Sequence, residues 1–147
     1  MKVFIDTNLV LDVLAQREPF FDESKRVWEL IEKGEVTGYL SATSLTDIFY
    51  ILKKHLGQNG AYASLSKLML VFRAVSVSEA DVRKALRLGL SDFEDALQLV
   101  YSRKLNIDYL VTRNTKDYPP SADEVIAPAE FLGKWQSGWP FDEDQNK

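Results

Sequence analysis

Short apolar runs alternate with longer segments of helical periodicity along this chain. The first run, Val3-Phe4-Ile5, is β-branched and aromatic, which is typical of a strand buried on both faces of a parallel sheet. A helical pattern follows it at once, from Asn8 to about Gln16. Further strands are expected at 36–42, 74–77, 109–111 and 125–126, and further helices at 22–33, 43–56, 62–72, 78–89, 91–101 and 128–135. Strands that alternate with helices predict an α/β fold with a parallel sheet covered on both faces.

Glycines and caps mark the boundaries of the central helices. The helix that begins near Thr43 is expected to stop at Gly57, and Asn59-Gly60 predicts a turn before the next helix. The stripe of that next helix is interpreted as core or as the face of a homodimer. The segment Ser91-Asp92-Phe93-Glu94 has the form of a capping box, and we expect it to open a helix that turns Phe93 toward the core.

The length and composition indicate one globular domain. The chain has 147 residues, of which 46% are hydrophobic and 27% are charged, and a chain of this size buries roughly two-thirds of its unfolded surface. We assign residues 1–135 to the domain and residues 136–147, where the chain turns polar and acidic, to a C-terminal tail. The chain starts on a strand without a leader pattern and has no apolar run of the roughly 18 residues that a membrane span needs. We therefore expect a soluble, cytoplasmic protein with no membrane contact.

Residue counts exclude several kinds of chemistry. The chain has no cysteine, which excludes disulfides, thiolate zinc sites and cysteine nucleophiles. Its one histidine, His55, lies beside two lysines and is interpreted as a solvated residue, so a histidine-rich metal site is excluded as well. The net charge of −4 argues against a polybasic nucleic-acid binder, although it permits a nuclease with a local positive rim.

Carboxylates follow the expected strands and open the expected helices. Asp6 ends the first strand, Asp47 lies in the first turns of a later helix, and Asp117 follows the strand at 109–111. Asp92 and Asp95 open a helix and lie three residues apart. Each acid taken alone is explained by helix capping. Because strand ends and the following helix starts share one edge of a parallel sheet, all of them together predict an acidic site at that edge.

Such a cluster favours a hard divalent cation. Carboxylates packed together repel one another, and a bound cation relieves that repulsion. Oxygen ligands without histidine or thiolate suit Mg²⁺ or Mn²⁺ rather than zinc. Ions of this kind at a sheet edge serve phosphoryl chemistry, since they polarise a phosphodiester and activate water. A glycine-rich phosphate loop is missing from the sequence, which argues against an NTPase.

Four motifs carry a family resemblance. The segments 4–8, 44–48, 92–97 and 111–118 resemble the ordered motifs of the PIN-domain family, in particular its VapC-like branch of toxin ribonucleases. The resemblance covers about residues 1–135. It implies a three-layer α/β/α fold with a central, mostly parallel sheet and Mg²⁺- or Mn²⁺-dependent cleavage of RNA. It also implies a homodimer and a small antitoxin as partners.

The resemblance also assigns roles to single residues. By position in the motifs, Asp6, Asp47 and Asp95 match the family acids, with Asp92 beside them as a further metal ligand. The closing motif supplies Thr112, Asn114 and Asp117. Two departures from the family are visible, because Asp47 stands where glutamate is usual and Asn114 stands where many members have an acid.

Neighbouring side chains are expected to support these acids. Thr7 and Asn8 are expected to orient Asp6, and Asn114 is a candidate for bonding to water or phosphate. Arg113 and Lys116 flank the acidic edge and are candidates for RNA phosphate contacts, with a solvated surface role as the alternative.

Two other functions remain open on the sequence. A PIN-fold binding module with weak or no catalytic activity is suggested by the two departures at Asp47 and Asn114. An enzyme that forms an aspartyl phosphate on Asp6 is disfavoured, because the Asp-x-Asp pair of the common phosphatase type is absent.

Overall fold

The computed structural model describes residues 1–138, and residues 139–147 of the predicted acidic tail lie outside this part of the chain. The strands and helices alternate as the hydrophobic pattern predicts. Their order is β1 (Lys2–Ile5), α1 (Thr7–Leu14), α2 (Phe21–Glu32), β2 (Thr37–Ser41), α3 (Ser44–Val71), β3 (Arg73–Val75), α4 (Glu79–Leu88), α5 (Phe93–Lys104), β4 (Tyr109–Val111), the 3-10 turn η1 (Thr115–Asp117), β5 (Val125–Ile126) and α6 (Pro128–Gln136).

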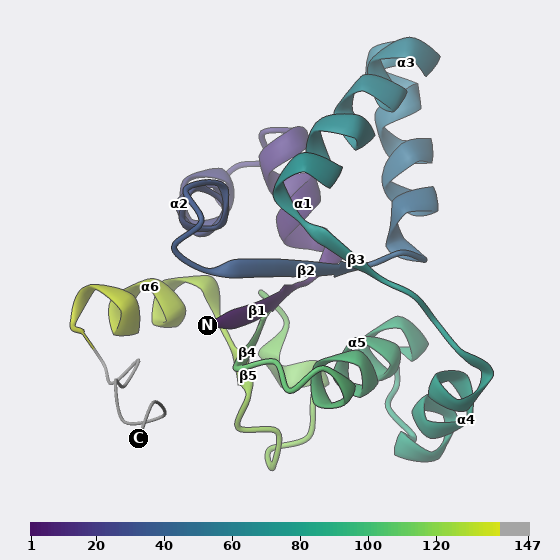
Figure 1. Ribbon diagram of the computed structural model, residues 1–147, viewed down its shortest axis with the longest axis vertical. Helices are drawn as coiled ribbons and strands as arrows, with labels where there is room; N and C mark the ends of the chain where they lie inside the picture. Colours follow the sequence, from purple (N-terminus) through teal and green to yellow (C-terminus); the bar gives the residue numbers. More distant parts are fainter. Residues whose placement is uncertain (139–147) are drawn as a thin grey trace.

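The sheet is parallel throughout, with the strand order β3-β2-β1-β4-β5 (Figure 1). The chain adds strands on one side of β1 first and then crosses to the other side at β4. In open α/β sheets this switch of direction leaves a crevice at the carboxyl ends of the two central strands, where ligands bind. Ile5 pairs with Val111 at the end of these strands, so the residues that follow both strands are brought together.

Helices cover both faces of the sheet and confirm the three-layer α/β/α prediction (Figure 1). Val3 and Ile5 belong to a core shared with α1, α2, α3 and α6, whereas Phe4 between them packs with α4 and α5. This alternation follows from the two-residue period of a strand. Both faces of β1 are thus buried, which explains why its sequence is apolar at each of these positions.

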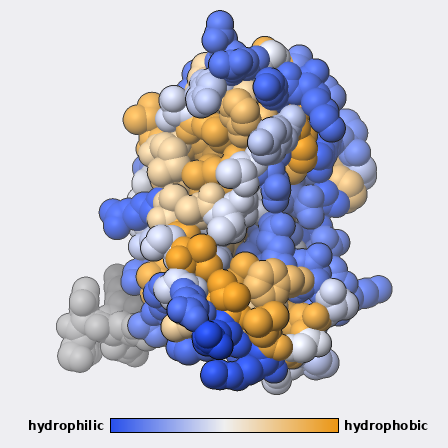
Figure 2. All heavy atoms as spheres, turned by 90° about the vertical axis from the view of Figure 1, so that its right-hand side faces the viewer, coloured by the Kyte–Doolittle hydropathy of each residue, from blue (hydrophilic) through white to orange (hydrophobic). Residues whose placement is uncertain are grey.

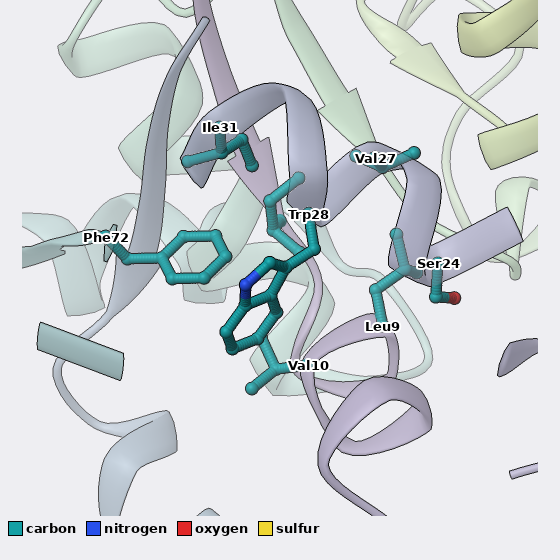
Figure 3. Close-up of a pocket in the computed structure, with 8 residues that line it drawn as sticks. Leu9, Val10, Ser24, Val27, Trp28, Ile31 and Phe72 are labelled. Carbon is teal, nitrogen blue, oxygen red and sulfur yellow. The ribbon is translucent and has the colours of Figure 1, made fainter. Parts of the chain in front are cut away.

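The larger core closes tightly around α2. Figure 3 shows the ring of Phe72 facing the indole of Trp28, and their ring centroids are 4.9 Å apart in an edge-on contact. Gly38 of β2 lies under the same layer, where a Cβ atom would stand 2.6 Å from Ile31 and 2.9 Å from Phe72. Only a glycine at this position allows the helix to lie so close to the sheet.

The long helix α3 contains the break that the sequence places at Gly57. Gly57 has φ +71 and interrupts the helical conformation, as a residue without a Cβ atom does readily. The predicted turn at Asn59-Gly60 is wrong, because these residues already lie in the second half of α3. Among residues 1–138, no helix combines the length and the apolar character that crossing a membrane requires.

The start of α5 also differs from the prediction. Asp92 is the capping residue, and its side chain accepts a hydrogen bond from the backbone of Asp95 at 3.0 Å. Phe93 was expected to face the core but is 46% exposed. It is the first residue of the helix and precedes the buried stretch Ala96–Ser102, so its ring lies outside the core.

Candidate active site

Asp6 lies at the switch point between β1 and β4 and is only 3% exposed. It is the residue before α1, but its carboxylate makes no capping hydrogen bond to that helix. Gln98 Nε2 donates to Oδ1 at 3.1 Å and Thr112 Oγ1 donates to Oδ2 at 2.9 Å. Each carboxylate oxygen retains a further lone pair. Helix capping therefore does not explain the Asp6 carboxylate, whose hydrogen bonds go to α5 and to the residue after β4.

Gln98 joins two carboxylates inside the fold. Its amide nitrogen donates to Asp6 and also to Glu94 Oε1, both at 3.1 Å. The hydroxyl of Tyr118 lies 3.3 Å from Asp95 Oδ1 and 3.4 Å from the amide oxygen of Gln98, and its one proton is shared between these two acceptors. Gln98 is 1% exposed, so its amide has no water to replace these partners. The network fixes Asp6 from the α5 side.

Sequence reasoning missed three members of this network: Glu94, Gln98 and Tyr118. Glu94 was interpreted only as part of a cap, but its Oε1 lies 2.7 Å from Thr7 Oγ1, which lies 2.7 Å from Ser44 Oγ. Thr7 was expected to orient Asp6 and instead links α1 to α5. The one available signal was a single glutamine in an otherwise apolar helical segment, four residues after Glu94.

Asp95 shows that this edge carries uncompensated negative charge. The pKa of its carboxyl is raised from 3.8 to about 7, chiefly by burial and further by repulsion from Asp92 and Asp6. The hydrogen bond from Tyr118 acts in the opposite direction, and Asp117 raises the pKa further. Burial also raises the pKa of Tyr118, so this phenol stays protonated as a donor. Three of the predicted acids, Asp6, Asp92 and Asp117, thus act electrostatically on a fourth, Asp95.

Asp47 occupies a neighbouring part of the surface. It is exposed and lines an open hollow of about 370 Å³ together with Thr7, Asn8, Leu11, Tyr50, Ile51 and Glu94. The capping residue of α3 is Thr43, and no side chain caps this helix. Glu94 connects the hollow to the network around Asp6 through Gln98. The structure thus places Asp47 at the rim of the same edge, beside an acid that the sequence did not single out.

Arg113 has a partner inside the protein. Its Nε lies 2.8 Å from Asp12 Oδ2 and its Nη2 donates to Oδ1 at 3.1 Å, and Asp12 is fully buried. The guanidinium also covers the ring of Phe20, 3.7 Å from its centroid. Its charge is therefore compensated before any RNA arrives. Lys116 is exposed, and the backbone of Asn114 donates to Thr112 Oγ1 at 3.1 Å.

The residues at this edge fit an open site for a hard cation. Within residues 1–138, no three acidic or histidine side chains are gathered closely enough to enclose an ion. Mg²⁺ is commonly held by one or two carboxylates, with water and substrate phosphate completing its shell. Asp6 and Asp95 offer oxygen ligands of that kind, and the mutual repulsion of the acids is the condition that a cation relieves.

Residues 2–116 match the sequence model of the PIN domain. The chain belongs to the PIN-domain family. Ribonuclease VapC1 of Aquifex aeolicus (strain VF5) is 23% identical over 141 residues, which covers 92% of this chain and 96% of that relative. The family resemblance that the four motifs indicated is thereby confirmed.

Solved structures share the fold of this PIN domain. A toxin-antitoxin complex from Klebsiella pneumoniae superposes with a TM-score of 0.66 at 21% identity, over 86% of this chain and 97% of that chain. VapC20 of Mycobacterium tuberculosis, described as a sarcin-ricin loop cleaving toxin, superposes with a TM-score of 0.60 at 19% identity, over 74% of this chain and 86% of that chain. The three-layer architecture of this chain is therefore shared with these solved structures.

Proposed function

We propose that this PIN domain is a divalent-metal-dependent ribonuclease and the toxin of a toxin-antitoxin pair. The observation that carries the proposal is the carboxylate of Asp6, which is buried at the switch point, free of helix capping and held by Gln98 and Thr112. The raised pKa of the Asp95 carboxyl also supports the proposal, because it indicates that the negative charge at this edge of the sheet is not offset within the protein. A relative with the same span is named a ribonuclease, which supports RNA as the substrate.

Different side chains at the site have different proposed roles in phosphodiester hydrolysis. Asp6 and Asp95 are the proposed main ligands of Mg²⁺ or Mn²⁺, and Asp92, Asp117 and Asp47 are proposed as further ligands, directly or through water. Such a cation, when bound, polarises a phosphodiester and lowers the pKa of a water molecule. Gln98 and Thr112 keep the Asp6 oxygens oriented, so the site does not reorganise when RNA binds.

The residues after β4 are proposed to contact the RNA backbone. Lys116 is exposed and offers a cation for a phosphate, and the side chain of Asn114 offers a hydrogen-bond donor. Arg113 is proposed to support this segment through its ion pair with Asp12. A small antitoxin is proposed as a partner protein, since structural neighbours include toxin-antitoxin complexes. A second copy of this chain is proposed as a partner on the family resemblance alone.

The proposal is tested with purified protein and single-stranded RNA. We expect cleavage with Mn²⁺, none with excess EDTA, and a loss of at least about 100-fold in Asp6→Asn. Asp123→Asn is the matched control, because it removes an exposed acid outside the described site. Full activity in Asp6→Asn, or activity that EDTA leaves unchanged, overturns the proposal.

A binding module that lacks catalysis is the second candidate, favoured by the absence of a closed group of three ligands among the described residues. It predicts no Mn²⁺ binding in a calorimetric titration at millimolar metal. The ribonuclease predicts a measurable binding heat that disappears in Asp6→Asn.

A further inference from the structure

The hollow beside Asp6 has a mixed lining. The carboxylates of Asp47 and Glu94 contribute to it together with the apolar and aromatic groups of Leu11, Ile51 and Tyr50. Figure 2 looks onto the carboxyl edge of the sheet and shows hydrophobic and hydrophilic surface side by side there. The hollow has a volume of about 370 Å³, which lies within the range of small-molecule sites.

Tyr50 is an aromatic side chain without a covering partner. It is 64% exposed at the hollow, and its ring meets the edge of Phe49 at a centroid distance of 5.9 Å. No described hydrogen bond holds its hydroxyl. An exposed ring of this kind stacks on a nucleobase, because every base presents a π-face, and one such contact is worth about tenfold in affinity.

Charge decides which part of RNA the hollow can accept. Carboxylates only accept hydrogen bonds, so the oxygens of Asp47 and Glu94 that bind no cation accept N–H groups from the edge of a base. Asn8 also lines the hollow and offers both a donor and an acceptor. Arg113, which follows β4, is already paired with Asp12.

We propose that this hollow is a nucleobase subsite of the RNA substrate and that Tyr50 is its stacking platform. The subsite rests on the proposed ribonuclease function. It holds an unpaired base of single-stranded RNA next to the phosphate at Asp6, and it favours bases that present an amino group to the carboxylates. Stacking involves no phosphate, so the part of the affinity that the Tyr50 ring supplies is expected to depend only weakly on salt.

The test measures binding of a fluorescent single-stranded RNA by anisotropy under two conditions. One uses Mn²⁺ and proteins that carry Asp6→Asn, and the other uses EDTA and proteins that keep Asp6. The tyrosine variants are compared with their parent protein in each condition. Tyr50→Ala is expected to weaken binding about tenfold and Tyr50→Phe to stay within about twofold, since phenylalanine keeps the ring. Tyr62→Ala is the matched control. Tyr62 lies on the same helix, is 57% exposed, also contacts Phe49, and does not line the hollow.

A second measurement locates the base. RNAs that each carry one abasic position are expected to show one position where the wild type loses about tenfold and Tyr50→Ala loses nothing further. The subsite is overturned when Tyr50→Ala binds like the wild type, when Tyr62→Ala loses as much, or when no RNA affinity is measurable. Mn²⁺-dependent cleavage by the Tyr50→Ala protein at an unchanged KM contradicts the subsite but agrees with the proposed ribonuclease function. If no protein cleaves RNA while Tyr50→Ala still binds RNA more weakly than its parent, the ribonuclease function is contradicted and the base-binding role of Tyr50 is retained.

Discussion

Replacing Asp95 with asparagine is expected to stabilise the metal-free protein. The pKa of the Asp95 carboxyl is raised from 3.8 to about 7, so the folded state is penalised whenever this group is ionised. Asparagine removes the charge, while its oxygen still accepts the hydrogen bond from Tyr118 that now reaches Asp95 Oδ1 at 3.3 Å. The backbone contact from Asp95 to the capping residue Asp92 is unaffected by the change.

The size and the pH dependence follow from this pKa. A rise from 3.8 to about 7 corresponds to a ceiling of about 4 kcal/mol at about 1.4 kcal/mol per pKa unit. Asp95 is partly exposed, and solvent screening reduces the expected gain at pH 8 to about 1–2 kcal/mol. A raised carboxyl pKa means that stability is lost as the pH rises from 3.8 toward 7. At pH 5 the gain in unfolding free energy of Asp95→Asn over the wild type is therefore expected to be less than about half of the gain at pH 8.

Urea unfolding in EDTA measures this difference at both pH values. Comparison of the two proteins cancels the other carboxylates, and Asp123→Asn is the control for a change of net charge. With Mn²⁺ present, the wild type is expected to regain stability by mass action and Asp95→Asn to regain less. The reasoning is refuted if Asp95→Asn is no more stable than the wild type at pH 8 in EDTA.

Two further variants test the fold and the rim of the site. Gly38→Ala is expected to cost about 1–3 kcal/mol of unfolding free energy, because its methyl group would stand 2.6 Å from Ile31 and 2.9 Å from Phe72; an unchanged urea midpoint would contradict this close packing. Arg113→Ala is expected to cost about 2–3 kcal/mol, because it leaves the buried carboxylate of Asp12 without its cation. The thermal midpoint of Arg113→Ala checks this value, and a loss of RNA affinity at unchanged stability would instead support the predicted contact of Arg113 with an RNA phosphate.

Local pattern was sufficient for the fold and for the first acid. The apolar run before Asp6 is buried on both faces of the sheet, so its sequence carries the strand signal at each position. Asp6 lies at the end of that strand, and parallel pairing then places Thr112 beside it. These positions follow from chain order and from strand geometry, which a sequence displays directly.

Contacts between distant segments were not visible in the sequence. Gln98 reaches Asp6 across 92 positions, and Arg113 reaches Asp12 across 101. The apolar neighbours of Gln98 indicate burial but do not identify its partner, and an arginine in a loop is an ordinary surface residue by local criteria. Only the packing of α5 against the sheet edge, and of the loop after β4 against α1, gives them buried partners. Phe93 shows the converse case, since an aromatic residue at a helix start was expected inside and lies outside.

The cleavage of single-stranded RNA by the wild type and by Asp6→Asn, with Mn²⁺ and with EDTA, tests the central claim most directly. The acidic edge predicts that only the wild type with Mn²⁺ yields products, with Asp6→Asn slower by at least about 100-fold although it is folded. Equal cleavage by the two proteins, or equal cleavage in EDTA, would contradict a metal-dependent site at the switch point of this sheet.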